Sequence, residues 1–248
     1  MAEPERRIAL LIDADNAPAA KIDVILAEVA RHGVANVRRA YGNWKSPHLK
    51  SWEATLHEYA IRPIQQFAYS SGKNASDMAM VIDAMDLLYA RNLDGFAIVS
   101  SDADFTPLVM RLLTDGVKVY GFGEKKTPLP FVNACSKFTY LEALVQPSTE
   151  ATAVTNKPRT AKELRDDTRL LQMLRSAVES ASGDDGWAHL GQVGHQISNQ
   201  ASFDPRNYGF RKLSDLIEAT GLFEVNRENQ ILWIRPRQRA KTKAAKKG

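Results

Sequence analysis

The sequence predicts an α/β sandwich built on a parallel sheet, followed by a small second domain. Through the first 145 residues, apolar runs of strand length alternate with segments of helical periodicity. This alternation is typical of βαβ units, in which helices cover both faces of a parallel sheet. The apolar pattern then lapses and resumes in a shorter segment, and 248 residues leave room for two cores.

The first expected strand carries the main functional signal. Residues 8–12 (IALLI) form a continuous apolar run that ends at Asp13, with Asp15 and Asn16 next in the chain. Such a run indicates a strand buried on both faces of a parallel sheet. Open α/β sheets bind ligands beyond the carboxyl ends of their strands, which is where Asp13 would lie.

The remaining elements of the first domain follow in order. Further strands are expected at residues 36–44, 61–69, 95–101 and 118–123. Helices are expected at residues 22–32, 52–59, 77–91 and 105–114, with a last helical segment starting at residue 129. Pro63 should place the third strand near an edge of the sheet, because proline cannot donate to a ladder. Ser76 is a suitable N-cap for the helix at 77–91.

The second domain is expected at residues 168–236, after a linker at 146–167 that is rich in proline, threonine, alanine and charge. One helical face begins at Leu170, and GWAHLGQVGHQIS and YGFRKLSDLIEAT suggest two more helices. FEVNRENQILWI alternates around a polar turn, as a short β-hairpin does. Three helices and a hairpin of this size indicate a winged helix.

The net charge of +4 is unevenly distributed. Residues 235–248 hold seven of the 33 basic residues and no acid, which leaves 26 basic and 29 acidic residues in the rest of the chain. A disordered basic tail at 237–248 would add non-specific attraction to phosphates, or would serve only as a solvated tail. The single cysteine, Cys135, indicates a reducing compartment and fits a small buried residue.

The chain shows no signal of export or of membrane insertion. MAEPERR lacks the apolar region of a signal peptide, and no run of 18 apolar residues occurs. We therefore expect a cytoplasmic protein with no membrane partner.

Acidic residues recur at the places where the predicted strands end or the helices begin. Asp13 and Asp15 follow the first strand, Asp77 opens a helix, and Asp102 and Asp104 follow the strand at 95–101. Strands that are neighbours in a doubly wound sheet bring such residues together at the topological switch point. Oxygen ligands without histidine or cysteine favour Mg²⁺ or Mn²⁺, and Asn16 fits as a neutral partner of Asp13.

Each of these acids also has a structural interpretation. Asp15 and Asp104 precede helices and could serve as N-caps. Asp77 lies in a first helical turn, where the helix dipole favours an acid. Asp83 and Asp86 fit a solvated or salt-bridged helix face, with Asp83 a distant ligand candidate.

Three motifs together resemble the NYN domain, a branch of the PIN-like ribonucleases. They are LIDADNAP, GKNASDMAMVIDAM and IVSSDADFTPLV, within residues 6–145. The resemblance implies a Rossmann-like three-layer sandwich and an endoribonuclease that binds Mg²⁺ or Mn²⁺. It assigns catalysis to Asp13, Asn16, Asp77, Asp102 and Asp104, metal binding to the four aspartates among these, and RNA contacts to Lys73 and Ser100.

The second domain resembles the LOTUS domain, also called OST-HTH, over about residues 168–236. The most specific part is Phe203-Asp204-Pro205-Arg206-x-Tyr208-Gly209. The resemblance implies binding of RNA or of a protein partner. Arg206, Arg211 and Lys212 could form a basic face beside Tyr208, whose ring could stack on a base. Without the resemblance, Arg211 and Lys212 fit an ordinary exposed helix face, and His189 and His195 fit structural roles.

Three functions remain open on the sequence alone. The first is a metal-dependent endoribonuclease with an appended RNA-binding domain. The second is a haloacid-dehalogenase-like phosphatase, in which Asp13 would be the nucleophile and Asp15 the acid. The third is an RNA-binding adaptor that retains the acids for a structural metal.

Overall fold

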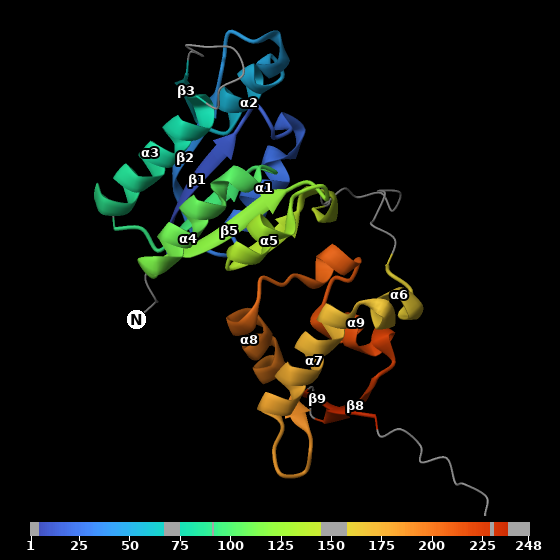
Figure 1. Ribbon diagram of the computed structural model, residues 1–248. Helices are drawn as coiled ribbons and strands as arrows, with labels where there is room; N and C mark the ends of the chain where they lie inside the picture. Colours follow the sequence, from blue (N-terminus) through green and yellow to red (C-terminus); the bar gives the residue numbers. More distant parts are fainter. Residues whose placement is uncertain (1–4, 67–74, 91, 145–157, 229–230, 238–248) are drawn as a thin grey trace, which may run out of the picture. The chain divides into compact units, whose positions relative to one another are not determined.

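The computed structural model describes residues 5–66, 75–90, 92–144, 158–228 and 231–237. The chain divides into two compact units (Figure 1). The first unit comprises Met1–Asn156 together with Ala201–Asn207, and the second comprises Lys157–Gln200 and Tyr208–Gly248. Residues 238–248 of the basic tail expected at 237–248, and most of the expected linker, lie outside the described residues.

A six-stranded sheet forms the centre of the first unit. Its strands are β1 (Arg7–Asp13), β2 (Val34–Gly42), β3 (Arg62–Gln65), β4 (Gly95–Val99), β5 (Lys118–Gly123) and β6 (Lys137–Tyr140). Their order is β3-β2-β1-β4-β5-β6, and every neighbouring pair is parallel. The direction of winding reverses between β1 and β4, so the topological switch point lies where Asp13 ends β1.

Helices cover both faces of this sheet, which confirms the predicted three-layer sandwich. They are α1 (Ile22–Val29), α2 (Trp52–Glu58), α3 (Ala75–Ala90), α4 (Thr106–Thr114) and α5 (Leu129–Ala134). Alternate residues of β1 serve the two faces: Ile8, Leu10 and Ile12 pack with α1 and α2, and Ala9 and Leu11 pack with α3, α4 and α5. Burial of each large aliphatic side chain contributes roughly 1.5–3 kcal/mol.

Two local predictions for the first unit were wrong, and one was confirmed. The segment that follows α5 is not helical but forms β6, the edge strand opposite β3. Ser76 lies inside α3 rather than at its cap, since the helix begins at Ala75. Asp83 is salt-bridged, which is one of the two states expected for it: its carboxylate accepts hydrogen bonds from Arg39 and Tyr41 of β2.

The contacts of Asp83 have a structural consequence. Burial and the neighbouring Asp83 raise the pKa of Tyr41, so this hydroxyl remains a donor. The Asp83 contacts fix α3 against β2, while Met80, Ala84 and Leu87 bury the same face of the helix at spacings of four and three residues. Asp77 is thereby held at the end of α3 that precedes these anchors.

The second unit combines helices with a small antiparallel sheet, as the winged-helix prediction required. Its elements are α6 (Ala161–Asp166), α7 (Thr168–Ala181), β7 (Ala188–His189), α8 (Leu190–Gln200), α9 (Leu213–Thr220), β8 (Phe223–Glu228) and β9 (Ile231–Pro236). The strands pair in the order β7-β9-β8. α6 falls in the segment expected as linker, and a capping box between Thr160 and Glu163 starts it.

The predicted helical face of the second unit is its core. Leu170, Leu174 and Val178 of α7 are buried, together with residues of α8, α9 and β9. None of the described helices is long and apolar enough to cross a membrane.

Candidate functional site

Asp13 is a buried carboxylate at the carboxyl end of β1. Its Oδ2 atom accepts hydrogen bonds from Asn16 Nδ2 at 2.9 Å and from Ser100 Oγ at 2.7 Å. Its Oδ1 atom is buried and has no hydrogen-bond partner among the described residues. Burial raises the pKa of Asp13, and the hydrogen bonds from Ser100 and Asn16 partly oppose that shift. One oxygen of Asp13 is therefore oriented by the protein, and the other is left unsatisfied.

Ser100 joins Asp13 to the loop that follows β4. The pairing of Ile12 with Val99 places the ends of β1 and β4 side by side. The buried Ser100 hydroxyl donates to Asp13 and accepts a hydrogen bond from the backbone N–H of Asp102 at 3.0 Å. The resemblance suggested an RNA contact for Ser100, whereas the structure uses its hydroxyl inside the protein.

Asp77 faces the acids of β1 and of the β4 loop from α3. Burial is the main cause that raises the pKa of Asp77 to about 6, and the charges of Asp13, Asp102, Asp15 and Asp104 raise it further. All five carboxylates predicted from the sequence thus share one electrostatic neighbourhood. Like charges held this close together make ionisation of Asp77 less favourable.

The structure tests the N-cap interpretation of each acid separately. Asp102, not Asp104, is an N-cap: it caps the short 3-10 helix Ala103–Phe105 that precedes α4, and its Oδ1 accepts a hydrogen bond from the backbone N–H of Asp104 at 2.9 Å. Asp15 caps no helix and instead accepts a hydrogen bond from Ser76 Oγ at 3.0 Å. Asp77 lies in the first turn of α3, as expected.

The donor chemistry of this cluster fits a hard divalent cation. Every charged donor is a carboxylate, and oxygen ligands suit Mg²⁺ and Mn²⁺. Among the described residues, no group of three or more acidic, histidine or cysteine side chains is arranged to hold a metal ion. The unsatisfied Asp13 Oδ1 and the repulsion felt by Asp77 are the two features that a cation would relieve.

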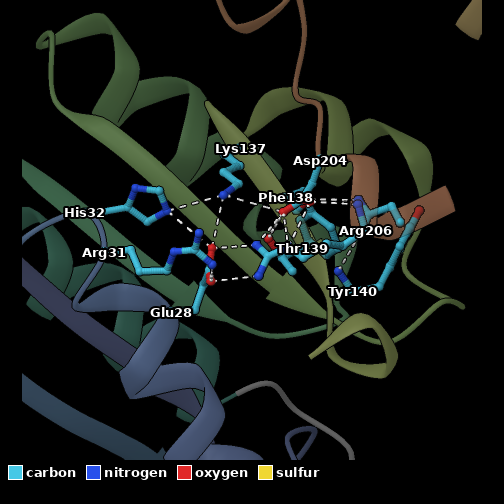
Figure 2. A network of polar contacts seen from close by, with 10 residues as sticks. Glu28, Arg31, His32, Lys137, Phe138, Thr139, Tyr140, Asp204 and Arg206 are labelled. Atoms are coloured by element: carbon cyan, nitrogen blue, oxygen red, sulfur yellow. Dashed lines mark hydrogen bonds and ion pairs between the residues drawn. The ribbon is translucent and has the colours of Figure 1, made fainter. Parts of the chain in front are cut away.

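The sequence-predicted RNA contacts are dispersed in the structure. Arg211 and Lys212 are exposed before α9, and the guanidinium of Arg159 lies 4.8 Å from the centre of the Tyr208 ring. Arg206 is instead engaged with Glu28 and Asp204 (Figure 2). Lys73 lies outside the described residues.

Glu28 is a buried, ion-paired residue that sequence reasoning missed. It occupies a buried position on the apolar face of α1, next to Val29 and three residues after Ile25. A charged residue at such a position requires a partner, and this was the available signal. His189 and His195 have structural contacts: His189 packs edge-on against Trp233, and His195 pairs with Asn199.

Asp77→Asn should raise the melting temperature of the metal-free protein at pH 7. The pKa of Asp77 is raised from 3.8 to about 6, so ionisation destabilises the folded state as pH rises between those values. With about 1 kcal/mol left after solvent screening, we expect a gain of about 2–4 °C. The difference should vanish below about pH 4. Calorimetry in EDTA at pH 3.5–8 measures it, and an equal or lower melting temperature at pH 7 would contradict the repulsion.

Comparison with known proteins identifies both units. A family model described as the NYN domain matches residues 7–142, and one described as the OST-HTH/LOTUS domain matches residues 165–234. An uncharacterised protein of Methanocaldococcus jannaschii is 30% identical over 123 residues, which are 48% of each chain. The chain thus spans about half the length of that relative.

Two solved structures show more distant likeness. A protein of unknown function from Vibrio parahaemolyticus is 19% identical with a TM-score of 0.46, over 56% of this chain and 95% of that one. The WlbA dehydrogenase of Bordetella pertussis is 14% identical with a TM-score of 0.30, over 73% and 41% of the two chains. The match over residues 7–142 covers more than half of the chain, which therefore belongs to the NYN-domain family and carries a C-terminal OST-HTH/LOTUS domain.

Proposed function

We propose that the protein is a metal-dependent endoribonuclease whose OST-HTH/LOTUS domain binds RNA. The two domains support an RNase-type, RNA-associated function. The observation that carries the catalytic part is the convergence of Asp13, Asp77 and Asp102 at the switch point of the sheet, where burial and the acidic neighbours raise the pKa of Asp77.

The residues proposed to hold Mg²⁺ or Mn²⁺ are Asp13, Asp77, Asp102 and Asp104. When bound, a divalent cation lowers the pKa of water and stabilises the charge that develops on a phosphodiester during hydrolysis. Asn16 and Ser100 are proposed to orient the carboxylate of Asp13, because both donate to its Oδ2 atom. These two hydrogen bonds would keep the Oδ1 atom of Asp13 directed at the bound cation.

RNA binding is assigned to the exposed cations of the second unit. Arg211 and Lys212 present charge to phosphates, and the Tyr208 ring, next to Arg159, offers an aromatic surface for a base. Phosphate contacts of this kind do not depend on sequence, so we expect weak base preference at low salt.

A cleavage assay with purified full-length protein tests the proposed function. A labelled RNA oligonucleotide should be cut at internal positions with Mg²⁺ or Mn²⁺ and spared with EDTA, while p-nitrophenyl phosphate stays intact. Hydrolysis of the phosphate monoester instead would favour the phosphatase. RNA binding without cleavage under both metals would favour the adaptor.

A further inference from the structure

Residues 201–207 belong to the first unit, although the residues on both sides belong to the second. This segment holds the first five residues, 203–207, of the most specific part of the OST-HTH motif. Figure 2 shows its Asp204 and Arg206 in a network of polar contacts with residues of α1 and β6. The network contains two carboxylates, Glu28 and Asp204, whose side chains are only 3% and 2% exposed.

One guanidinium donates hydrogen bonds to both carboxylates. Arg206 Nη1 and Nη2 donate to the two oxygens of Glu28 at 2.8 and 2.6 Å, which is a bidentate pair. Arg206 Nε and Nη2 donate to the two oxygens of Asp204 at 3.0 and 2.6 Å. All three nitrogens of the Arg206 guanidinium therefore face protein carboxylates.

Other residues of the first unit also contact these two carboxylates. Lys137 Nζ lies 3.1 Å from Glu28 Oε1 and 3.5 Å from Asp204 Oδ2. Thr139 Oγ1 donates to Asp204 Oδ2 at 3.0 Å, and His32 Nε2 lies 3.5 Å from Glu28 Oε1. Both carboxylates are thus surrounded by donors from the turn after α1, from β6 and from the segment itself.

Asn207 adds a second kind of contact, to the backbone of the edge strand. Its Nδ2 donates to the Phe138 carbonyl at 2.9 Å, and its Oδ1 accepts from the Tyr140 N–H at 3.1 Å. β6 is the last strand of its sheet, and an edge strand presents unpaired N–H and C=O groups. The amide of Asn207 satisfies one of each, as a neighbouring strand would.

We propose that Asp204-Pro205-Arg206-Asn207 is an intramolecular docking motif, and that its binding site is the surface formed by Glu28, His32, Lys137, Thr139 and the edge of β6. The motif fits this site by charge, with one cation between two acids, and by shape, with an amide on the strand edge. Arg206 then serves attachment of the segment to the NYN domain and not RNA recognition. An RNA phosphate that recruited Arg206 would leave two buried carboxylates without their main partner.

Amide hydrogen exchange on the full-length chain tests the docking motif without metal or RNA. In Arg206→Ala and in Glu28→Gln, the amides of residues 137–140 and 201–207 should exchange at least about tenfold faster than in wild type. The double variant should exchange no faster than the quicker single variant, because both changes remove the same contact. Arg211→Ala is the matched control, since it removes an exposed arginine five residues away, and its exchange should equal that of wild type.

Asn207→Ala keeps the test decisive if the charge variants unfold. It removes only the amide on the strand edge, so the Tyr140 N–H should lose protection while the amides of β1 keep theirs. RNA affinity, measured in parallel, should stay within about twofold of wild type in Arg206→Ala and Asn207→Ala. Unchanged exchange at residues 137–140 in every variant would overturn the proposal. A larger loss of RNA affinity in Arg206→Ala than in Glu28→Gln would also overturn it.

Discussion

Asp13→Asn should reduce metal-dependent RNA cleavage by at least about 100-fold while RNA affinity stays within about twofold of wild type. The amide keeps the size of the side chain but removes its charge. Because Asn16 and Ser100 both donate to Oδ2, the amide oxygen should take that position and leave NH₂ in place of Oδ1. A donor would then replace the acceptor that the proposed cation needs. Asp77→Asn and Asp102→Asn should also lose activity, because each removes a negative charge that would hold the proposed cation.

Two further variants make the test specific. Asp86→Asn changes an exposed acid on the same helix as Asp77, and it should cleave RNA like wild type. Asp15→Asn should have the smallest effect among the clustered acids, since Asp15 is exposed and contacts Ser76. A large loss of phosphate-monoester hydrolysis in Asp15→Asn would support the phosphatase instead. Cleavage at the wild-type rate by Asp13→Asn would contradict the proposed site.

The parts of the fold that local patterns control were predictable. Continuous apolar runs placed β1, β4 and β5 to within two residues at each end, because strands buried on both faces tolerate few polar residues. β6 was missed because its four residues are too few to show a period and follow directly on a helical segment. The grouping of the acids followed from parallel pairing, since residues after neighbouring strands must meet at one edge.

The contacts of Glu28 lay beyond this kind of reasoning. Its partner Arg206 is 178 positions away in the sequence, and nothing in the local pattern of either segment specifies the other. The sequence does not distinguish the basic residues around Tyr208 from one another. In the structure, Arg206 is paired within the first unit, whereas Arg211 is exposed. Which arginine is free for a ligand depends on tertiary packing, and composition does not determine it.

Glu28→Ala should lower the free energy of unfolding of the first unit by about 3–5 kcal/mol at pH 7, because it removes one of the two buried carboxylates that pair with Arg206 and Lys137. Urea denaturation followed by circular dichroism measures this loss. Lys126→Ala, which breaks an exposed pair with Glu124, is the control and should leave stability unchanged. A Glu28→Ala protein as stable as the control would mean that the network contributes little.

The same network predicts acid sensitivity. Burial alone would raise the pKa values of Glu28 and Asp204, but hydrogen bonds and charges from Arg206 and Lys137 lower both overall, and a hydrogen bond with His32 adds to this effect at Glu28. A carboxyl whose folded pKa lies below its unfolded value stabilises the protein above about pH 4, and this contribution is lost as pH falls towards the folded value. Wild type should therefore lose stability steeply below about pH 4, and Glu28→Ala should lose less over the same range. Parallel pH profiles of the two proteins would refute this account of the network, because the lowered pKa of Glu28 would then contribute nothing to folding.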